Sequence, residues 1–173
     1  MFTLYSADFT GNRGNCSYPH KTVVMNTDNL REAVCHDYVC AEYKNHYRNG
    51  ENFISADCLP VDCDNDHSED PKDWVTPADV LEAFPGVSIA IHYSRFNNRE
   101  KNGKPARPKF HVLFPIDRMT DATLYSDMKK LVNSIFPYFD TKALDAARFF
   151  FGTQEPNVEL YPGRMNLTKF LND

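Results

Sequence analysis

Two apolar segments, residues 87–94 and 109–116, constrain the fold of this chain more than any other feature. The first reads VSIAIHYS and alternates Ile89 and Ile91 with smaller or polar residues, and the second reads KFHVLFPI. Such alternation, with many β-branched and aromatic residues, is typical of β-strands. The residues between them, 97–108, are charged and rich in Asn and Gly, which favours a turn. The two segments therefore predict an antiparallel hairpin with a long loop.

Other segments carry the periodicity or the boundary residues of further elements. Residues 53–62, FISADCLPVD, are apolar in patches, which indicates one or two short strands. The chain up to about Thr27 is interrupted by glycines and a proline and is expected to form a loop, and residues 145–151 are expected to form a short helix that runs into a strand or loop. Helices are predicted at 29–44 after the cap Asp28, at 77–84 after the cap Thr76, and at about 120–136, where Leu124, Met128, Leu131, Val132 and Ile135 form an apolar stripe.

The order of these elements predicts an α+β fold, with helices on a small antiparallel sheet as in the split βαβ family. The chain has 173 residues and no repeat or low-complexity tract, so we expect one domain with its own core. The N-terminus lacks the pattern of a signal peptide, and no stretch approaches the roughly 20 apolar residues of a membrane span. We therefore expect neither a secreted nor a membrane protein.

The cysteines also favour a protein that is not secreted. Their number is five, and none forms a Cys-x-x-Cys pair, so a disulfide framework is not expected and a reducing cytoplasm is favoured. Cys35 and Cys40 flank His36 but no second ligand pair follows at metal spacing, so zinc is not expected either.

The charges are segregated along the chain. The net charge of −5 argues at first against a nucleic-acid partner. However, residues 57–82 hold nine acidic side chains and one Lys, whereas residues 95–109 hold six basic side chains and one Glu. This pattern suggests a site with cations on one side and phosphates on the other, and the alternative is a pair of solvated loops of opposite sign.

Asp62 and Asp64 stand two residues apart at the end of a predicted strand, so their carboxylates point to the same face. Hard oxygen ligands of this kind suit Mg²⁺ or Mn²⁺, and two-metal sites promote in-line attack on phosphorus. A calcium loop is a minor alternative, because His67 stands where such a loop needs Gly and Asp73 where it needs Glu.

Four further polar residues are candidates whose roles stay open when each is taken alone. His111 lies in the middle of the second hairpin strand, where a lone histidine is more often a satisfied core or surface residue than a catalyst. Asp140 would supply a third carboxylate or cap a helix, and Arg148 or Asp145 would form a surface ion pair.

Together, and in this order, the segments resemble the motifs of the archaeo-eukaryotic primase superfamily, specifically the primase-polymerase domains of phage and mobile-element replication proteins. CLPVDCDN looks like the first motif, a hydrophobic run with Asp-x-Asp. RPKFHVLF looks like the second motif with its His, and YFDTKALDAARFFFG looks like the third, an Asp followed by an Ala-Arg-aromatic run. The resemblance covers about residues 27–153 and implies a primase-like catalytic core within a single domain, 1–173. In such a core an RRM-like antiparallel sheet is packed by helices, with an αβ unit at the N-terminus.

The resemblance also implies roles for individual residues. Two Mg²⁺ or Mn²⁺ ions would be held by Asp62, Asp64 and Asp140, with Asp145 as the alternative third ligand, and His111 would contact the phosphates of the incoming nucleotide. Lys109 stands where the family's second motif often has Ser. Further contacts to nucleotide or template would come from Ser94, Arg95, Lys109 and Arg148.

The function implied is a DNA primase and polymerase, a nucleotidyltransferase that makes or extends primers on single-stranded DNA from nucleoside triphosphates. We expect a monomer that replicates a phage, plasmid or other mobile element in the cytoplasm of a bacterial or phage-infected cell, with a helical primase module or a helicase as partner. The preference for deoxy- or ribonucleotides is left open by the sequence.

Two other function classes compete with this reading. A non-catalytic RRM-like module would bind nucleic acid through exposed aromatic rings, but it has no use for Asp62 and Asp64 beside its platform. A metal-dependent nuclease or replication initiator could use the same sheet. A relaxase-like initiator needs two histidines around one hydrophobic residue, whereas His111 is followed by Val and Leu.

Overall fold

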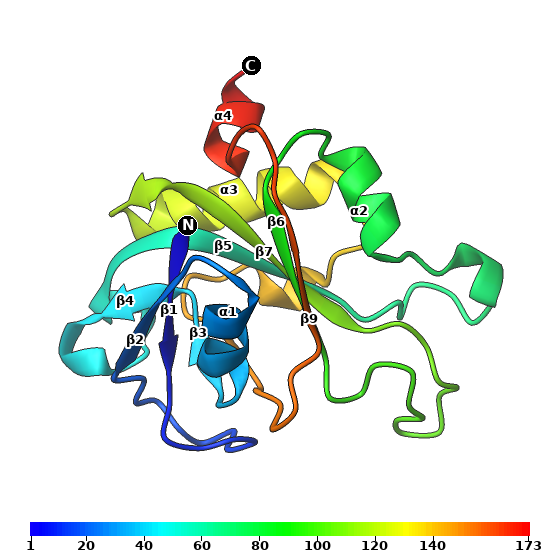
Figure 1. The fold of residues 1–173 in the computed structure, drawn as a ribbon, viewed down its shortest axis with the longest axis horizontal. Helices are drawn as coiled ribbons and strands as arrows, with labels where there is room; N and C mark the ends of the chain where they lie inside the picture. Colours follow the sequence, from blue (N-terminus) through cyan, green and yellow to red (C-terminus); the bar gives the residue numbers. More distant parts are fainter.

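The computed structural model describes residues 1–173 and contains two antiparallel sheets (Figure 1). The larger sheet has the strand order β4-β5-β7-β6-β9 and the smaller one β2-β1-β3-β8. No helix has the length and apolar character needed to cross a membrane. The strands of the larger sheet are β4 (Ala41–Tyr43), β5 (Phe53–Cys63), β6 (Ile89–Tyr93), β7 (Phe110–Met119) and β9 (Val158–Tyr161), and those of the smaller are β1 (Phe2–Ser6), β2 (His20–Val24), β3 (Tyr38–Val39) and β8 (Phe149–Phe150). The helices are α1 (Thr27–Val34), α2 (Pro77–Ala83), α3 (Ala122–Ile135) and α4 (Leu167–Asn172), with short 3₁₀ helices η1 (Lys44–His46), η2 (Gly50–Asn52), η3 (Pro71–Asp73) and η4 (Thr141–Ala143).

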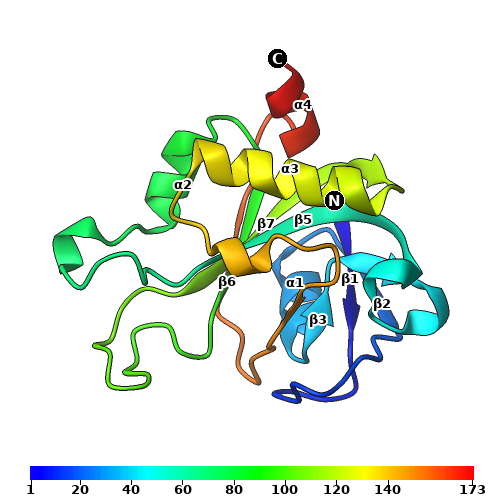
Figure 2. The same ribbon diagram turned by 180° about the vertical axis from the view of Figure 1, so that it is seen from behind.

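The larger sheet is covered on both faces. Helices α2, α3 and α4 lie on one face, and the N-terminal αβ unit of β1, β2 and α1 lies on the other (Figures 1 and 2). Side chains along β7 alternate between the two cores. Phe110, Val112 and Phe114 pack in the core under the three helices. Leu113 points the opposite way and packs in the core beneath α1. A sheet buried on both faces has little room for polar side chains, so those that it does bury need a reason.

The predicted hairpin and two of the predicted helices are confirmed. Strands β6 and β7 pair antiparallel, with Ile91 opposite Val112. Helix α2 begins after Thr76, whose side chain and that of Asp79 form a capping box, and α3 begins after Asp121, which caps it. The segment 53–62 forms one continuous strand, β5, of 11 residues.

The helix predicted at 29–44 is wrong beyond residue 34. Helix α1 is capped by Asn26 rather than by the predicted Asp28, and it ends at Val34. Strands β3 and β4 follow, because Tyr38 and Val39 pair with β1. The buried carboxylate of Asp37 helps to fix this exit from the helix by accepting hydrogen bonds from the backbone N–H groups of Gly11, Asn12 and Gly152.

The loop predicted for the chain up to Thr27 is also wrong. Phe2–Ser6 and His20–Val24 pair as β1 and β2, and every residue of β1 is buried. The glycines and Pro19 break only the connection between these strands. The expectation for residues 145–151 is partly right, since β8 lies there, but the short helix η4 comes earlier, at Thr141–Ala143.

The apolar stripe predicted on α3 does not define its buried face. Tyr125, Lys129 and Val132 are buried, whereas Leu124 is 58% exposed and Leu131 is 48% exposed. The buried polar groups find partners, because the Tyr125 hydroxyl donates to the carbonyl oxygen of Cys58 (2.7 Å) and the Lys129 ammonium donates to that of Asp145 (2.7 Å). These hydrogen bonds let the helix bury a polar face against β5.

Two matched Leu→Ala substitutions test the orientation of α3. Leu59→Ala on β5 removes a side chain that is 0% exposed and should lower the free energy of unfolding by about 2–5 kcal/mol. Leu124→Ala should change it by no more than about 0.5 kcal/mol, because the side chain already contacts water. Chemical denaturation of both variants provides the measurement, and equal losses would contradict the observed orientation.

Candidate active site

Three polar residues form a row across the larger sheet. Asp62 on β5 lies opposite His111 on β7, and His111 lies opposite His92 on β6. Their apolar neighbours along each strand, such as Val61 and Val112, point to the helical layer. The strand period of two therefore places a carboxylate and two imidazoles on the face that the N-terminal unit covers.

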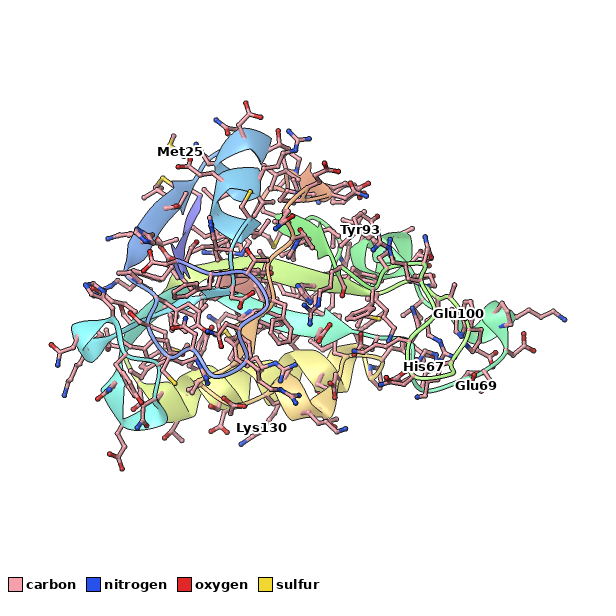
Figure 3. All side chains as sticks on the ribbon, turned by 90° about the horizontal axis from the view of Figure 1, so that it is seen from below. Met25, His67, Glu69, Tyr93, Glu100 and Lys130 are labelled. Carbon is pink, nitrogen blue, oxygen red and sulfur yellow. The ribbon has the colours of Figure 1, made fainter.

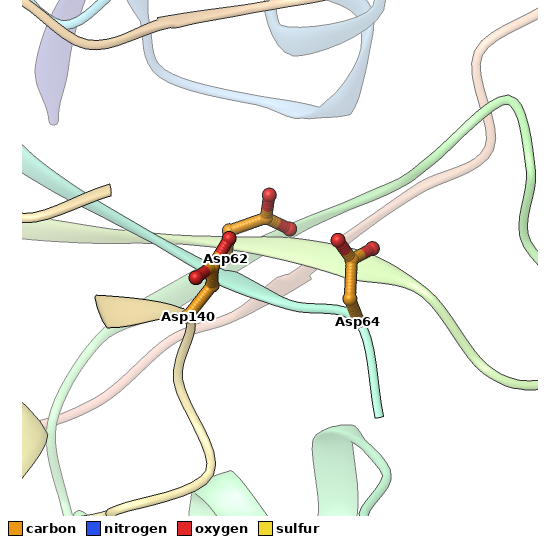
Figure 4. A group of neighbouring side chains, drawn as sticks. All are labelled: Asp62, Asp64 and Asp140. Carbon is orange, nitrogen blue, oxygen red and sulfur yellow. The ribbon is translucent and has the colours of Figure 1, made fainter. Parts of the chain in front are cut away.

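Three carboxylates meet at one end of this row. Ligand oxygens of Asp62, Asp64 and Asp140 all lie within 4.8 Å of one another, Asp62 and Asp64 coming from the end of β5 and Asp140 from the segment after α3 (Figure 4). The backbone N–H of Asp140 donates to the carbonyl oxygen of Asp62 at 2.7 Å, which anchors that segment on the strand. Asp145, the alternative third ligand, lies outside the cluster, and its carboxylate accepts from the backbone N–H of Ala147.

The environment of Asp62 suits a bound cation. Its side chain is 8% exposed, and its Oδ1 atom is buried without a hydrogen-bond partner. Burial and the neighbouring carboxylates of Asp64 and Asp140 raise the pKa of Asp62 well above its ordinary value, against the opposing effect of Arg148, which lies 3.6 Å away, and of Lys109. An orphaned buried oxygen beside two further carboxylates matches the hard donor set that Mg²⁺ or Mn²⁺ prefers, so the residues present fit such a metal.

A positively charged pocket adjoins the acidic cluster. It has a volume of about 230 Å³ and contains Asp62, Asp64 and His111 on one wall. The guanidinium of Arg95 lies 4.2 Å from the centre of the Phe151 ring, a cation–π contact that orients it. A second, larger pocket of about 680 Å³ shares Ser94 and Arg95 with the first. The cationic residues that line the first pocket are Arg13, Arg95, Lys101 and Arg148.

Part of the basic segment is not free to bind phosphate. Lys109, a predicted nucleotide contact, is 4% exposed and its ammonium lies 3.4 Å from Asp64. Its charge therefore compensates the acidic cluster. Glu69 and Glu100, one from each charged segment, lie at the same end of the molecule (Figure 3). Three basic side chains of residues 95–109 form ion pairs with the acidic segment, as the alternative of two paired loops predicts. The pairs are Lys104 with Asp66, Arg107 with Glu69, and Lys109 with Asp64.

Two side chains behind His111 were missed from the sequence. The Tyr38 hydroxyl lies 3.1 Å from Nδ1 of His111 and 3.0 Å from Nδ1 of His92. Burial lowers the pKa of His92 to about 3 and that of His111 well below its ordinary value, so both rings are neutral at pH 7. The alternation within 87–94 could have singled out His92, but Tyr38 lay inside the helix wrongly predicted at 29–44.

Lys129 is a third residue that the sequence did not single out. Its side chain is almost fully buried beneath the segment that carries Asp140, and its ammonium donates to the carbonyl oxygens of Ala143 (3.5 Å) and Asp145 (2.7 Å). Burial lowers the pKa of Lys129 to about 8. The buried ammonium thus ties α3 to the segment that supplies the third carboxylate.

Comparison with known proteins gives one informative match. No protein-family model matches the chain, and no curated protein matches it in sequence. Among solved structures, the AEP domain of the primase-polymerase of cyanophage S-2L superposes with a TM-score of 0.54 over 99% of this chain and 88% of that one. The chain has the fold of this primase-polymerase domain. The expected α+β, primase-like architecture is therefore confirmed, and because the sequence identity is 12%, the match establishes the fold alone.

Divalent metal should stabilise the protein through the acidic cluster. A cation that binds only the folded state adds about 2.7 kcal/mol at 100 times its Kd, which for a chain of this size raises Tm by roughly 5–10 °C. Mn²⁺ or Mg²⁺ titrated in a thermal denaturation series should give this rise. Asp62→Asn should abolish it, yet should leave the metal-free protein at least as stable, because the amide avoids the cost of ionising a buried carboxyl group.

Two further variants separate the possible third ligands in the same assay. Asp140→Asn should lose most of the metal-dependent rise in Tm, whereas Asp145→Asn should retain it. The reverse result would identify Asp145 as the ligand.

Proposed function

We propose that this chain is a DNA primase and polymerase that joins nucleoside triphosphates on a single-stranded DNA template with two Mg²⁺ or Mn²⁺ ions. The observation that carries the proposal is the cluster of three carboxylates, with the orphaned Oδ1 of Asp62, beside a pocket lined by four cationic side chains. Joining a 3′-hydroxyl to an α-phosphate needs both kinds of charge side by side. The fold shared with a primase-polymerase domain supports the same activity.

The metal-binding role is assigned to the carboxylates of the cluster. Asp62, Asp64 and Asp140 would hold the ions, which when bound lower the pKa of the attacking hydroxyl and neutralise the leaving pyrophosphate. Asp62 lies in β5 and Asp64 follows its last residue, and the hydrogen bond from the backbone N–H of Asp140 to the Asp62 carbonyl keeps the third carboxylate beside them. A rigid donor set of this kind preserves the geometry on which an in-line reaction depends.

The phosphate-binding role is assigned to the cationic wall of the pocket. Arg95 and Arg148 would bind the triphosphate, since a guanidinium can donate two parallel hydrogen bonds to phosphate oxygens. His111 would donate from Nε2 to the same group. Ser94 lines both pockets. It would therefore contact the nucleotide between its triphosphate and the larger pocket, where template or nucleoside would lie. Lys109 would act indirectly, by compensating Asp64.

The biological setting belongs to the same proposal. A primase of this kind would act as a monomer in the cytoplasm of a bacterial or phage-infected cell, during replication of a phage, plasmid or other mobile element. A helical primase module or a helicase would help it to hold the template.

A primer-synthesis assay tests the proposed activity. The purified chain is incubated with Mn²⁺ or Mg²⁺, single-stranded template with and without primer, and labelled ribo- or deoxynucleotides, and the products are resolved by length. We expect growth with primer, which identifies a polymerase, and growth without primer, which identifies a primase. Asp64→Ala should reduce the rate at least roughly a hundredfold, because the developing charge on the phosphate would lose its compensation.

Asp127→Asn provides the matched control for loss of a carboxylate. Asp127 is exposed on α3 and pairs with Lys130, remote from the cluster, so this variant should retain full activity. Cleavage of the template without added nucleotides would show a nuclease instead. Template binding with neither growth nor cleavage would favour the non-catalytic module.

A further inference from the structure

Three polar groups meet behind the acidic cluster with almost no access to water. The Tyr38 hydroxyl, Nδ1 of His92 and Nδ1 of His111 lie 3.0, 3.1 and 3.2 Å apart in a closed triangle. Tyr38 and His92 are 0% exposed and His111 is 6% exposed. The ring of Phe150 covers the triangle, with its centre 5.6 Å from that of Tyr38 and 4.6 Å from that of His111. Water therefore does not complete the hydrogen bonding, and the three groups must satisfy one another.

The triangle allows few arrangements of protons. Two N–H groups cannot point at each other, and two bare lone pairs at 3.2 Å would repel and leave one nitrogen without a donor. One Nδ1 atom must therefore carry a proton while the other does not. Because a neutral imidazole has a single N–H, the two histidines must adopt opposite tautomers.

The groups that face Nε2 of each ring decide which histidine carries its proton on Nδ1 and which on Nε2. Nε2 of His111 lies 3.8 Å from Oδ1 of Asp62, the buried acceptor that has no partner. When Asp62 is ionised, as a carboxylate that holds a cation is, a proton on Nε2 of His111 faces this oxygen favourably, whereas a lone pair there would face another lone pair. At the other end, Nε2 of His92 lies 2.9 Å from the Thr153 hydroxyl, which can donate as readily as it can accept. The constraint from Asp62 therefore dominates.

We propose that Tyr38 and His92 are positioning residues that hold His111 as its Nε2–H tautomer, so that this N–H is directed toward the acidic cluster and the phosphate-binding pocket. In this arrangement the Tyr38 hydroxyl donates to Nδ1 of His111, and Nδ1–H of His92 donates to the Tyr38 oxygen or to His111. The Thr153 hydroxyl completes the chain by donating to Nε2 of His92. This inference rests on the proposed function through Asp62, whose ionised carboxylate is the proposed metal ligand.

The arrangement contains a redundancy that a merely structural contact would lack. Tyr38→Phe leaves His92 at 3.2 Å as a donor to Nδ1 of His111, and His92→Leu leaves the Tyr38 hydroxyl at 3.1 Å. Only the double variant removes both donors. Loss of function in the double variant should therefore exceed the product of the two single losses.

The first test reads the tautomers directly in the nucleotide-free protein with Mg²⁺ added, so that the Asp62 carboxylate is ionised. Histidine is labelled with ¹⁵N, and a long-range ¹H–¹⁵N correlation spectrum at neutral pH distinguishes protonated from unprotonated ring nitrogens. The signals of His92 and His111 are assigned from His92→Leu and His111→Gln. We expect a protonated Nε2 and a bare Nδ1 in His111, and the reverse in His92. In the double variant, the Nδ1 resonance of His111 should move toward that of a nitrogen without a hydrogen bond. A proton on Nδ1 of His111, or the same tautomer in both rings, would overturn the proposal.

The second test measures affinity for a nucleoside triphosphate with Mn²⁺ by titration calorimetry. Each single variant should bind roughly threefold more weakly or less, and the double variant roughly thirtyfold more weakly, which is the weight of one hydrogen bond to a charged group. Tyr125→Phe is the matched control, since it removes another buried hydroxyl that bonds elsewhere, to Cys58, and it should leave both spectrum and affinity unchanged.

The outcomes separate this inference from the proposed function. A double variant that binds no more weakly than the product of the singles would overturn the positioning role. Wild-type protein that binds no nucleotide would overturn the proposed function, and the ¹⁵N spectrum would then still decide the tautomers.

Discussion

The antiparallel pairing of β5 with β7, and of β7 with β6, is the constraint on which the rest of the site depends. It sets Asp62 opposite His111 and His111 opposite His92, while Val61 and Val112 turn into the helical core. Because side chains alternate along a strand, a slip of one residue would exchange the polar row for the apolar one. The hydrophobic cost of that exchange protects the register, so the core that stabilises the sheet also fixes the geometry of the site.

The site then has to accommodate charge where water is scarce. Asp62 is almost buried, and two more carboxylates stand within ligand distance of it. Such a cluster opposes folding unless cations offset it. Arg148 and Lys109 supply part of the offset from within the chain, and the unpaired Oδ1 of Asp62 marks what they leave uncompensated. The same deficit makes the cluster receptive to a divalent ion, so a local loss of stability and the capacity to bind metal have one physical origin.

The smaller sheet contributes more than a cover for the larger one. Strand β3 brings Tyr38 against the two histidines, and β8, paired with β3, brings Phe150 over them. The carboxylate of Asp37 meanwhile binds backbone N–H groups from residues near both ends of the chain, Gly11 and Gly152. Residues far apart in the sequence thus exclude water from the buried side of His111. Hydrogen bonds from protein groups, rather than from water, therefore determine which ring nitrogen of His111 carries the proton.

Much of the fold was readable from local pattern. The alternation at 87–94 and 109–116 predicted the hairpin, and the cap at Thr76 located the start of one helix, because strand period and capping are properties of neighbouring residues. The motif order also led to Asp62, Asp64 and Asp140 as metal ligands, a prediction in keeping with their proximity in the structure. Tertiary structure alone decided the rest. Residues 38–39 and 41–43 are strands because β1 and β5 pair with them. Lys129 points inward from α3 because a backbone carbonyl 16 residues later accepts its hydrogen bond. Lys109 forms an ion pair with Asp64 and is not free to bind phosphate. In each case the deciding partner lies far along the chain, and its position follows only from the packing of the whole.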